Sequence, residues 1–244
     1  MISVITVVFN SEKLIEKTIQ SVINQSYKDF EYIIIDGGST DGTTEVIKEY
    51  SDHIAFWSSN QDLGISDAFN KGISKATGEL IGIINAGDIL LDDALISIYN
   101  AFTENNFDYL YGNSVLREIN DIDLRVLKPL KVVGFPYGGM PFQHSTFYIT
   151  RRVFESVGNY NINYKTAMDF EFFLRVLKMN FKSYYLDKNL TVYYRGGMSD
   201  QRYLSGNLEV VCASLTFQNV SFLRVIGNAL NNILKTFGRK VFKI

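Results

Sequence analysis

The stretch Tyr32-Ile33-Ile34-Ile35-Asp36-Gly37-Gly38-Ser39-Thr40-Asp41-Gly42-Thr43 decides how the rest of the chain is interpreted. An isoleucine-rich run ends at Asp36, and glycines, a serine and a second aspartate then lead into a helical pattern. Strands of a parallel sheet that are covered on both faces have this near-continuous apolar character. Asp36 therefore falls at the carboxyl end of a predicted strand, where open α/β sheets bind ligands, and the glycines permit a tight turn. Ser39 or Asp41 could cap the helix that follows.

The same arrangement recurs at two further predicted strands. An apolar run over residues 3–9 ends at Asn10, and another over residues 80–84 ends at Asn85-Ala86-Gly87-Asp88. The central stretch by itself would also fit a strand-to-helix turn in any α/β protein. Three apolar strands that each end in polar residues instead predict a polar crevice along one edge of a sheet.

Composition is that of an ordinary globular protein and argues against several kinds of site. The 244 residues suit one α/β domain, or one domain with a C-terminal appendage. A net charge of −2 gives no sign of a nucleic-acid-binding surface. The single cysteine, Cys212, excludes an internal disulfide, and two histidines, His53 and His144, argue against a histidine-rich metal site. Because a strand begins at once and no apolar run reaches about 18 residues, we expect a cytoplasmic protein without a signal peptide or a membrane-spanning helix.

Strands and helices alternate in the first part of the chain. Predicted strands occupy residues 3–9, 32–36, 54–57 and 80–84. Predicted helices begin near residues 11 and 43, a third ends near residue 78, and a fourth covers residues 92–102. This order predicts an α/β fold with a mostly parallel central sheet and helices on both faces.

Beyond residue 105 the pattern changes to short strands, which predict a small mixed second sheet. These strands cover residues 109–113, 124–127, 144–149, 184–186 and 191–194. Residues 134–143 are rich in glycine, proline and aromatic residues, and we expect them to form a mobile loop near a site. Residues 167–177 form a strongly apolar predicted helix with Asp169 and Glu171 near its start.

From Tyr203 onward the sequence is predicted to be helical, with an apolar stripe and an excess of basic residues towards its end. Such a basic amphipathic helix could lie on an anionic membrane surface, or pack on its own domain or on a second subunit. We therefore divide the chain into a domain over residues 1–200, with halves at 1–104 and 105–200, and a C-terminal helical extension over residues 201–244.

Four motifs occur in the order found in a known family. They are VVFN, IDGGSTDGT, GISDAFNKG and NAGD at residues 7–10, 35–43, 64–72 and 85–88, and a helix that carries Asp169 follows them. Together, over residues 1–200, they resemble the family 2 glycosyltransferases. The resemblance implies the GT-A fold, with a Rossmann-like sheet that binds a nucleotide-sugar donor. It also implies transfer of the sugar to an acceptor hydroxyl with inversion at the anomeric carbon.

The resemblance assigns the end of the first strand and the Asp-Gly-Gly-Ser turn to the nucleotide. Asp36 would accept a hydrogen bond from the uracil ring, and Phe9 and Asn10 would line the base and ribose. Lys71 would border the diphosphate, and the alternative is a solvated helix residue. The full nucleotide-binding set that we predict is Phe9, Asn10, Glu12, Asp36, Gly38, Ser39, Asp62, Lys71, Asn85, Ala86 and Gly87.

Residues 85–88 match the acidic metal motif of the family only in part, because Asn85 and Gly87 stand at positions that are often acidic. The retained acid, Asp88, would bind Mg²⁺ or Mn²⁺ together with the phosphates of the donor. A carboxylate at this place could instead cap the next helix. The departure leaves the strength of metal dependence open.

Asp169 stands where the family carries its catalytic base, and Met168 replaces the glutamate that usually precedes it. Asp169 would take the proton from the acceptor hydroxyl. Glu171 lies about 200° further around the helix, so it cannot readily share that role. His144, Arg195 and Ser199 are predicted to contact the diphosphate or the acceptor, and a structural role is the alternative for the histidine.

The leading hypothesis is an inverting hexosyl- or N-acetylhexosaminyl-transferase that uses a UDP-sugar in bacterial cell-surface polysaccharide biosynthesis. The acceptor would be a saccharide, for example one on a polyisoprenyl diphosphate at the inner face of the membrane, and the enzyme could be oligomeric. A sugar-phosphate nucleotidyltransferase would need a glycine-rich basic loop after the first strand, which Phe9-Asn10-Ser11-Glu12-Lys13 does not provide. A protein that binds nucleotide sugar without catalysis is the third hypothesis, because the acidic motif is incomplete.

Overall fold

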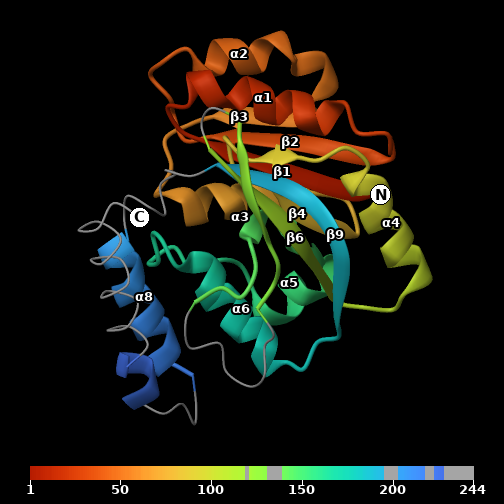
Figure 1. Ribbon diagram of the computed structural model, residues 1–244. Coiled ribbons are helices and arrows are strands. Elements are labelled where there is room, and N and C mark those ends of the chain that lie inside the picture. Colours follow the sequence, from red (N-terminus) through yellow and green to blue (C-terminus); the bar gives the residue numbers. More distant parts are fainter. Residues whose placement is uncertain (119–120, 131–138, 195–202, 218–222, 228–244) are drawn as a thin grey trace.

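The computed structural model describes residues 1–118, 121–130, 139–194, 203–217 and 223–227 (Figure 1). Its strands are β1 (Ile2–Val8), β2 (Phe30–Asp36), β3 (Phe56–Ser59), β4 (Leu80–Ile83), β5 (Ile89–Leu90), β6 (Tyr109–Arg117), β7 (Asp123–Leu127), β8 (Tyr148–Thr150) and β9 (Ser183–Tyr194). Its helices are α1 (Glu12–Ile23), α2 (Thr43–Glu49), α3 (Ile65–Lys75), α4 (Ala94–Glu104), α5 (Arg151–Val157), α6 (Met168–Lys178) and α8 (Tyr203–Leu215). Short 3₁₀ turns lie at Ser51–His53 (η1) and His144–Thr146 (η2).

One nine-stranded sheet forms the centre of the molecule, in the order β3-β2-β1-β4-β8-β6-β9-β5, with β7 paired to β6. The strands β3, β2, β1 and β4 run parallel to one another. The alternation of strands and helices in the sequence therefore predicted this part of the fold correctly. The pairing of Val8 with Asp36 brings the carboxyl ends of β1 and β2 to the same edge of the sheet.

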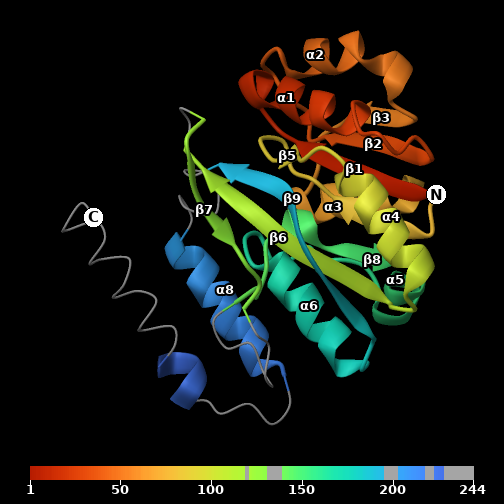
Figure 2. The same cartoon turned by 45° about the vertical axis from the view of Figure 1, so that its right-hand side comes forward.

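Helices cover both faces of the sheet, as predicted (Figure 2). Successive side chains of β1 point to opposite faces, so that Val4 enters one core cluster and Ile5 the other. The first cluster packs against α1, α2 and α4, and the second packs against α3, α5 and α6. These two apolar layers fix the sheet from both sides and place the ends of β1, β2 and β4 at one polar edge.

The predicted small second sheet is wrong in one respect, because it is continuous with the central sheet. Strand β8 pairs antiparallel with β4 on one side and with β6 on the other, which joins the two parts. The strand predicted over residues 144–149 is also shorter, because His144–Thr146 forms the turn η2 and only Tyr148–Thr150 is extended. A fully buried strand of three residues has so short an apolar run that its first and last residues cannot be predicted from the sequence.

The strands predicted over residues 184–186 and 191–194 are one strand, β9, which pairs in parallel with β6. The register between them shifts at Gly112/Asn113 and Asn113/Ser114, where the polar residues 187–189 lie. Because polar residues interrupt the apolar pattern there, the pattern predicted two strands instead of one. Strand β5 and helix α5, both of which are short, were not predicted from the sequence.

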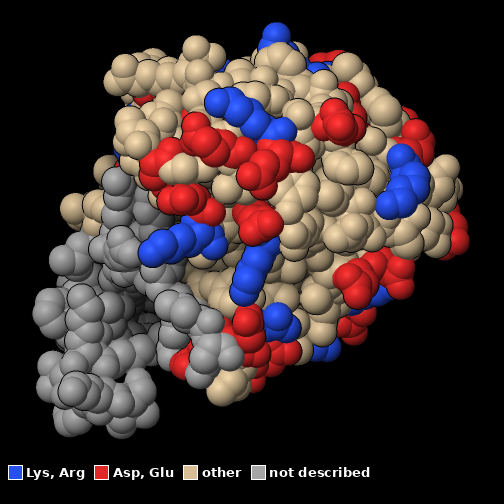
Figure 3. Space-filling model, turned by 90° about the horizontal axis from the view of Figure 1, so that it is seen from above, with Lys and Arg blue, Asp and Glu red and all other residues tan. Residues whose placement is uncertain are grey.

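Helix α8 packs against α6, through Phe170 and Leu174 of α6 and Ala213 of α8. No helix within the described ranges is long and apolar enough to cross a membrane. Most of the predicted basic C-terminal stretch, and residues 134–138 of the predicted loop, lie outside the described residues. On the face seen in Figure 3, acidic and basic side chains are interspersed, in keeping with a net charge near zero.

Candidate active site

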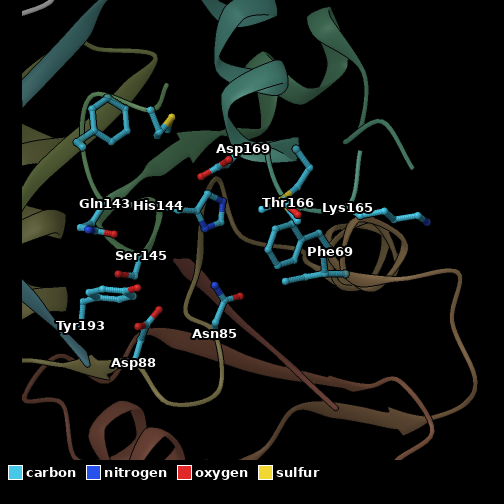
Figure 4. Close-up of a pocket in the computed structure, with 14 residues that line it drawn as sticks. Phe69, Asn85, Asp88, Gln143, His144, Ser145, Lys165, Thr166, Asp169 and Tyr193 are labelled. Atoms are coloured by element: carbon cyan, nitrogen blue, oxygen red, sulfur yellow. The ribbon is translucent and has the colours of Figure 1, made fainter. Parts of the chain in front are cut away.

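A cavity of about 280 Å³ opens at the polar edge of the sheet, beyond the end of β4 (Figure 4). Its walls come from the turn after β4, the start of α3, the η2 turn with the residues before it, the start of α6, and β9. The lining residues are Ile65, Phe69, Asn85, Asp88, Met140, Phe142, Gln143, His144, Ser145, Lys165, Thr166, Met168, Asp169 and Tyr193. Four residues that the sequence predicted for a site therefore meet in one cavity: Asn85, Asp88, His144 and Asp169.

The turn that carries Asp88 is held in place by helix α1. The Gly87 amide donates to the Thr18 hydroxyl at 2.9 Å, and that hydroxyl donates to the carbonyl of Asp88 at 2.9 Å. Gly87 has a φ of 101°, which favours glycine. Burial raises the pKa of the Asp88 carboxyl to about 7, and a backbone hydrogen bond from Asn85 opposes that effect. The turn therefore presents a half-buried carboxylate that is little compensated by protein partners.

Asn85, at the start of the same turn, contributes a second uncompensated oxygen. Its Oδ1 atom is buried and has no hydrogen-bond partner among the described residues. Hard divalent cations bind carboxylate and amide oxygens, and Mg²⁺ commonly takes its other ligands from substrate phosphates and water. Within the same residues no group of three or more His, Cys, Asp or Glu side chains could hold a metal. Asn85 and Asp88 thus fit a cation that is bound jointly with a phosphate-bearing substrate.

Asp169 lies in the first turn of α6 and faces the cavity (Figure 4). The Phe170 amide donates to its Oδ1 atom at 2.7 Å. Burial raises the pKa of the Asp169 carboxyl to about 6, against the effect of that hydrogen bond. Glu171 does not line the cavity and pairs with Arg175 instead, through two contacts of 2.9 Å. The expectation that the two acids of this helix differ in role therefore agrees with their placement.

His144 combines features of a structural residue and of a site residue. Its ring stacks on Phe69, with 5.2 Å between centroids, and its Nε2 atom lies 3.0 Å from the Tyr160 hydroxyl. Burial lowers the pKa of His144 to about 4, so the ring is neutral at pH 7. Its Nδ1 atom is shielded and lacks a hydrogen-bond partner in the described ranges. The imidazole is thus fixed on one side and unpaired on the other.

The predicted residues around Asp36 form a separate group that does not line this cavity. The Asp36 side chain is fully buried, and its Oδ2 atom accepts hydrogen bonds from the Gly38 amide at 3.1 Å, the Ser39 amide at 2.9 Å and the Ser59 hydroxyl at 2.5 Å. The Ser39 hydroxyl donates to the other oxygen. This carboxylate therefore holds the Gly-Gly-Ser turn in shape.

Asn10 ties the ends of β1 and β2 together. Its backbone amide donates to the Ser39 hydroxyl at 2.7 Å, and its Oδ1 atom accepts from the Thr40 amide at 2.9 Å. It does so with a φ of 45°, in the left-handed region that asparagine tolerates. The ends of the two strands are thus joined by hydrogen bonds between the side chain of one segment and the backbone of the other.

Phe9 and Asp62 form the exposed part of this second group. The Phe9 ring is 60% exposed, which is unusual for a phenylalanine at the end of a core strand. A Cβ atom placed on Gly37 would lie 2.6 Å from Asp62 Oδ2 and 3.4 Å from the Phe9 ring, so both side chains flank this glycine. An open aromatic face with an acid beside it is suited to a flat, hydrogen-bonding ligand.

The remaining predicted residues lie at the margins of the two groups. The Glu12 side chain lies against Gly42, and Lys71 pairs with Asp67 at 3.0 Å, as expected of a helix-surface residue. Ala86 and Gly87 belong to the turn of Asp88, and Gly38 to the turn of Asp36. Arg195 and Ser199 lie outside the described residues.

Several residues in or beside the cavity were not predicted from the sequence. Lys165 and Thr166 directly precede the helix of Asp169, and this closeness in sequence was a usable signal. Phe69 and Tyr160, which hold His144, come from separate segments, and their meeting depends on tertiary packing. Phe69 lies within the motif of residues 64–72 but was not singled out there, and nothing in the local pattern marks Tyr160, which contacts His144 from outside the cavity lining.

Comparison with known sequences agrees with this arrangement. The family model described as "Glycosyl transferase family 2" matches residues 3–177. The EpsE protein of Bacillus subtilis (strain 168), whose name describes it as a glycosyltransferase, is 29% identical over 198 residues, which are 78% of this chain and 71% of that protein. A "PGL/p-HBAD biosynthesis glycosyltransferase" of Mycobacterium bovis (strain BCG / Pasteur 1173P2) is 26% identical over 187 residues, covering 72% of this chain and 69% of the relative.

Solved structures share the fold. S. aureus TarS 1-349 in complex with UDP-GlcNAc has a TM-score of 0.68 at 17% identity, covering 98% of this chain and 74% of that chain. The mannosyltransferase PcManGT from Pyrobaculum calidifontis, in complex with GDP-Man and Mn2+, has a TM-score of 0.70 at 15% identity, with 98% and 74% covered. At these identities the likeness concerns the fold, which is that of the GT-A glycosyltransferases. With the family model matched over residues 3–177 of 244, this chain belongs to glycosyl transferase family 2.

Proposed function

We propose that this protein is an inverting glycosyltransferase that moves a sugar from a UDP-sugar to a hydroxyl group of a saccharide acceptor. The observation that carries the proposal is the pair Asp88 and Asp169, two carboxyls with raised pKa that line the same cavity of about 280 Å³ (Figure 4). Two acids in one water-poor site can take different roles, one towards the donor and one towards the acceptor. The UDP-GlcNAc of the TarS structure supports the choice of a UDP-sugar by likeness of fold.

The donor would be bound from two directions. Phe9 would stack on the uracil ring and Asp62 would accept hydrogen bonds from the base or ribose. Asp36 would shape the turn between them, and its direct contact with uracil stays a prediction because its oxygens already bind the turn. Asn85 and Asp88 would hold Mg²⁺ or Mn²⁺ with the diphosphate. When bound, that cation supplies positive charge beside the leaving group.

The acceptor would be activated by Asp169. As the acceptor oxygen attacks the anomeric carbon, the Asp169 carboxylate takes its proton, a new carbon–oxygen bond forms, and the bond to the diphosphate oxygen breaks on the opposite side. One displacement of this kind inverts the anomeric configuration. A pKa of about 6 suits this role, because the carboxylate is ionised at pH 7 and is still a stronger base than an ordinary aspartate.

We further propose that the acceptor is a saccharide of bacterial cell-surface polysaccharide assembly, for example one linked to a polyisoprenyl diphosphate. The bacterial relatives support this context by similarity. The residues from 224 onward include Arg224, Lys235, Arg239, Lys240 and Lys243, and this composition supports peripheral contact with an anionic membrane. The class of sugar that is moved, hexosyl or N-acetylhexosaminyl, is part of the same proposal.

The test is hydrolysis of a panel of UDP-sugars by the full chain, with and without Mn²⁺. We expect metal-dependent turnover in the parent, its loss in Asp88→Ala and in Asp169→Asn, and parental turnover in the matched control Asp92→Asn, whose acid is exposed outside the cavity. Binding of UDP should persist in Asp169→Asn. If no UDP-sugar binds to the parent, the proposed donor class is wrong.

A second candidate function follows from Asn85 and Gly87, which stand where the family motif is often acidic. A protein that binds nucleotide sugar without transferring it would keep the Phe9 and Asp62 surface and would not need a strong metal site. Binding of UDP-sugars without hydrolysis or transfer, at any Mn²⁺ concentration, would favour this second function.

A further inference from the structure

One carboxylate of helix α8 holds the turn that precedes the helix of Asp169. Glu209 accepts hydrogen bonds from three consecutive backbone amides: Lys165 at 3.0 and 3.1 Å, Thr166 at 2.8 Å and Ala167 at 2.8 Å. Ala167 is the N-cap residue of α6 and has no side-chain oxygen of its own for capping. A residue more than 40 positions further along the chain therefore satisfies the amide of the N-cap residue, which the helix leaves unpaired, and the amides of the two residues before it.

The contact between α8 and this turn is close enough to be specific. A Cβ atom on Gly206 would lie 2.9 Å from the Thr166 methyl carbon, so a larger residue would push the two segments apart. Gly206 precedes Glu209 by three residues and thus lies on the same side of α8. Further along the two helices, Phe170 and Leu174 of α6 pack against Ala213 of α8. The glycine allows α8 to approach, and the carboxylate then reaches the three amides.

The segment that Glu209 holds is part of the cavity wall. Lys165, Thr166 and Asp169 all line the cavity. Lys165 also donates from its side chain to the carbonyl of Leu63 at 2.5 Å, which ties the turn to the loop before α3. A shift of this turn would therefore move the predicted base relative to a bound acceptor. Misplacement by about 1 Å can reduce an enzymatic rate by roughly 100-fold.

We propose that Glu209 is a positioning residue of the transfer reaction, which fixes residues 165–167 and thereby the place of Asp169 in the cavity. This inference rests on the proposed function in one respect, namely that Asp169 is the base. The proposal also assigns α8 to the active site, whereas the predicted division at residue 200 placed this helix in a separate extension.

Glu209 also acts on Asp169 through its charge. Burial is the main cause of the raised pKa of Asp169, and the negative charge of Glu209 adds to it. The other charged or titratable groups of the described chain that face or flank Asp169 include Asp88, His144, Tyr160, Lys165, Glu171, Arg175 and Tyr193. Replacing Glu209 by glutamine keeps the shape and removes the charge, so the pKa of Asp169 should fall.

The first test needs no substrate. Amide hydrogen exchange of Lys165, Thr166 and Ala167 is compared by NMR in the parent, Glu209→Ala and the charge-matched control Glu155→Gln, whose acid is exposed on α5. We expect these amides to exchange at least about tenfold faster in Glu209→Ala and at the parental rate in the control. The carboxyl titration of Asp169, assigned with Asp169→Asn, should shift to lower pH in Glu209→Gln. Unchanged exchange together with an unchanged titration would overturn the proposal.

The second test measures hydrolysis of UDP-GlcNAc and UDP-glucose by the full chain with Mn²⁺. Glu209→Ala should lower kcat about tenfold or more with little change in KM, and Glu209→Gln should lower it less. In an Asp169→Asn background, Glu209→Ala should have no further effect, because its action passes through that residue. Additive losses would overturn the positioning role. If the parent hydrolyses neither sugar nucleotide, that result bears on the proposed function, and the exchange and titration data still decide the role of Glu209.

Discussion

The ends of β2 and β4 carry similar sequences of aspartate, glycine and small polar residues, but they differ in how their polar atoms are satisfied. At the end of β2, the Asp36 carboxylate is buried and binds two amides and two hydroxyls of its own chain. Beyond β4, Asp88 is little compensated and Asn85 Oδ1 has no partner among the described residues. Buried polar atoms without partners are costly, and they persist where a ligand supplies the missing bonds. The polar atoms of the first strand end are therefore satisfied within the protein, whereas those of the second are left available to a ligand.

Replacing Asp36 and replacing Asp88 should have different effects on the free energy of unfolding. We expect Asp36→Ala to lower the free energy of unfolding by about 3–5 kcal/mol, because it leaves several buried donors without an acceptor. Asp88→Asn should leave that free energy unchanged or raise it at pH 8, because it removes a poorly compensated charge. Denaturant unfolding with a linear extrapolation measures both. Equal losses for the two variants would contradict the comparison.

The largest effect on activity should come from Asp169. We expect Asp169→Asn to reduce donor hydrolysis by about 10³-fold, since general base catalysis contributes typically 10²–10⁴-fold. Its free energy of unfolding should change by less than about 1 kcal/mol, because the asparagine can still accept the Phe170 amide. Steady-state kinetics and unfolding curves of the same preparation provide the measurement. A fall in stability that matches the fall in rate would point to a structural role instead.

The pH dependence of the rate offers a smaller and independent effect. Asp169 must be ionised to accept a proton, so kcat should rise with pH through the pKa of about 6 and then level off. At pH 5 the rate should be roughly tenfold below its plateau, because about one carboxyl in ten is then ionised. A rate that is constant from pH 5 to pH 7, in the same buffer and metal concentration, would exclude this group as the base.

The smallest effect is expected at the exposed ring of Phe9. Loss of stacking in Phe9→Ala should weaken UDP binding about fivefold, at the lower end of what base stacking contributes. The control is Met179→Ala, which removes another exposed apolar side chain, 52% exposed at the end of α6. Calorimetric titration with UDP distinguishes them. Equal affinity of the two variants for UDP would show that the uracil ring does not stack on Phe9.

Much of this arrangement was predictable because local patterns encode it. The isoleucine run before Asp36 and the polar residues after β1 and β4 marked the carboxyl edge of the sheet. The motifs singled out Asp88 and Asp169, which the structure places in the lining of one cavity. The contacts that position them were not predictable. Tyr160 reaches His144, and Glu209 reaches residues 165–167, only after distant segments have packed. The single strand β9 was missed because the polar residues at its bulge break the alternation on which a strand is recognised.

Strand β8 has a consequence for how such a chain can change over evolutionary time. It meets β4 through three residue pairs and β6 through two, and it lies directly after the η2 turn that carries His144. In the sheet, β8 thus forms a short seam between the parallel block β3-β2-β1-β4 on one side and the strands β6 and β9 on the other. Strand β5 adds a second connection through two residue pairs with β9. A recombination event that preserved these few pairs, and the packing in the core cluster that both blocks share, could exchange one block while retaining the other. The seam would let the surface around Phe9 and Asp62 and the surface around Asp169 diversify at different rates.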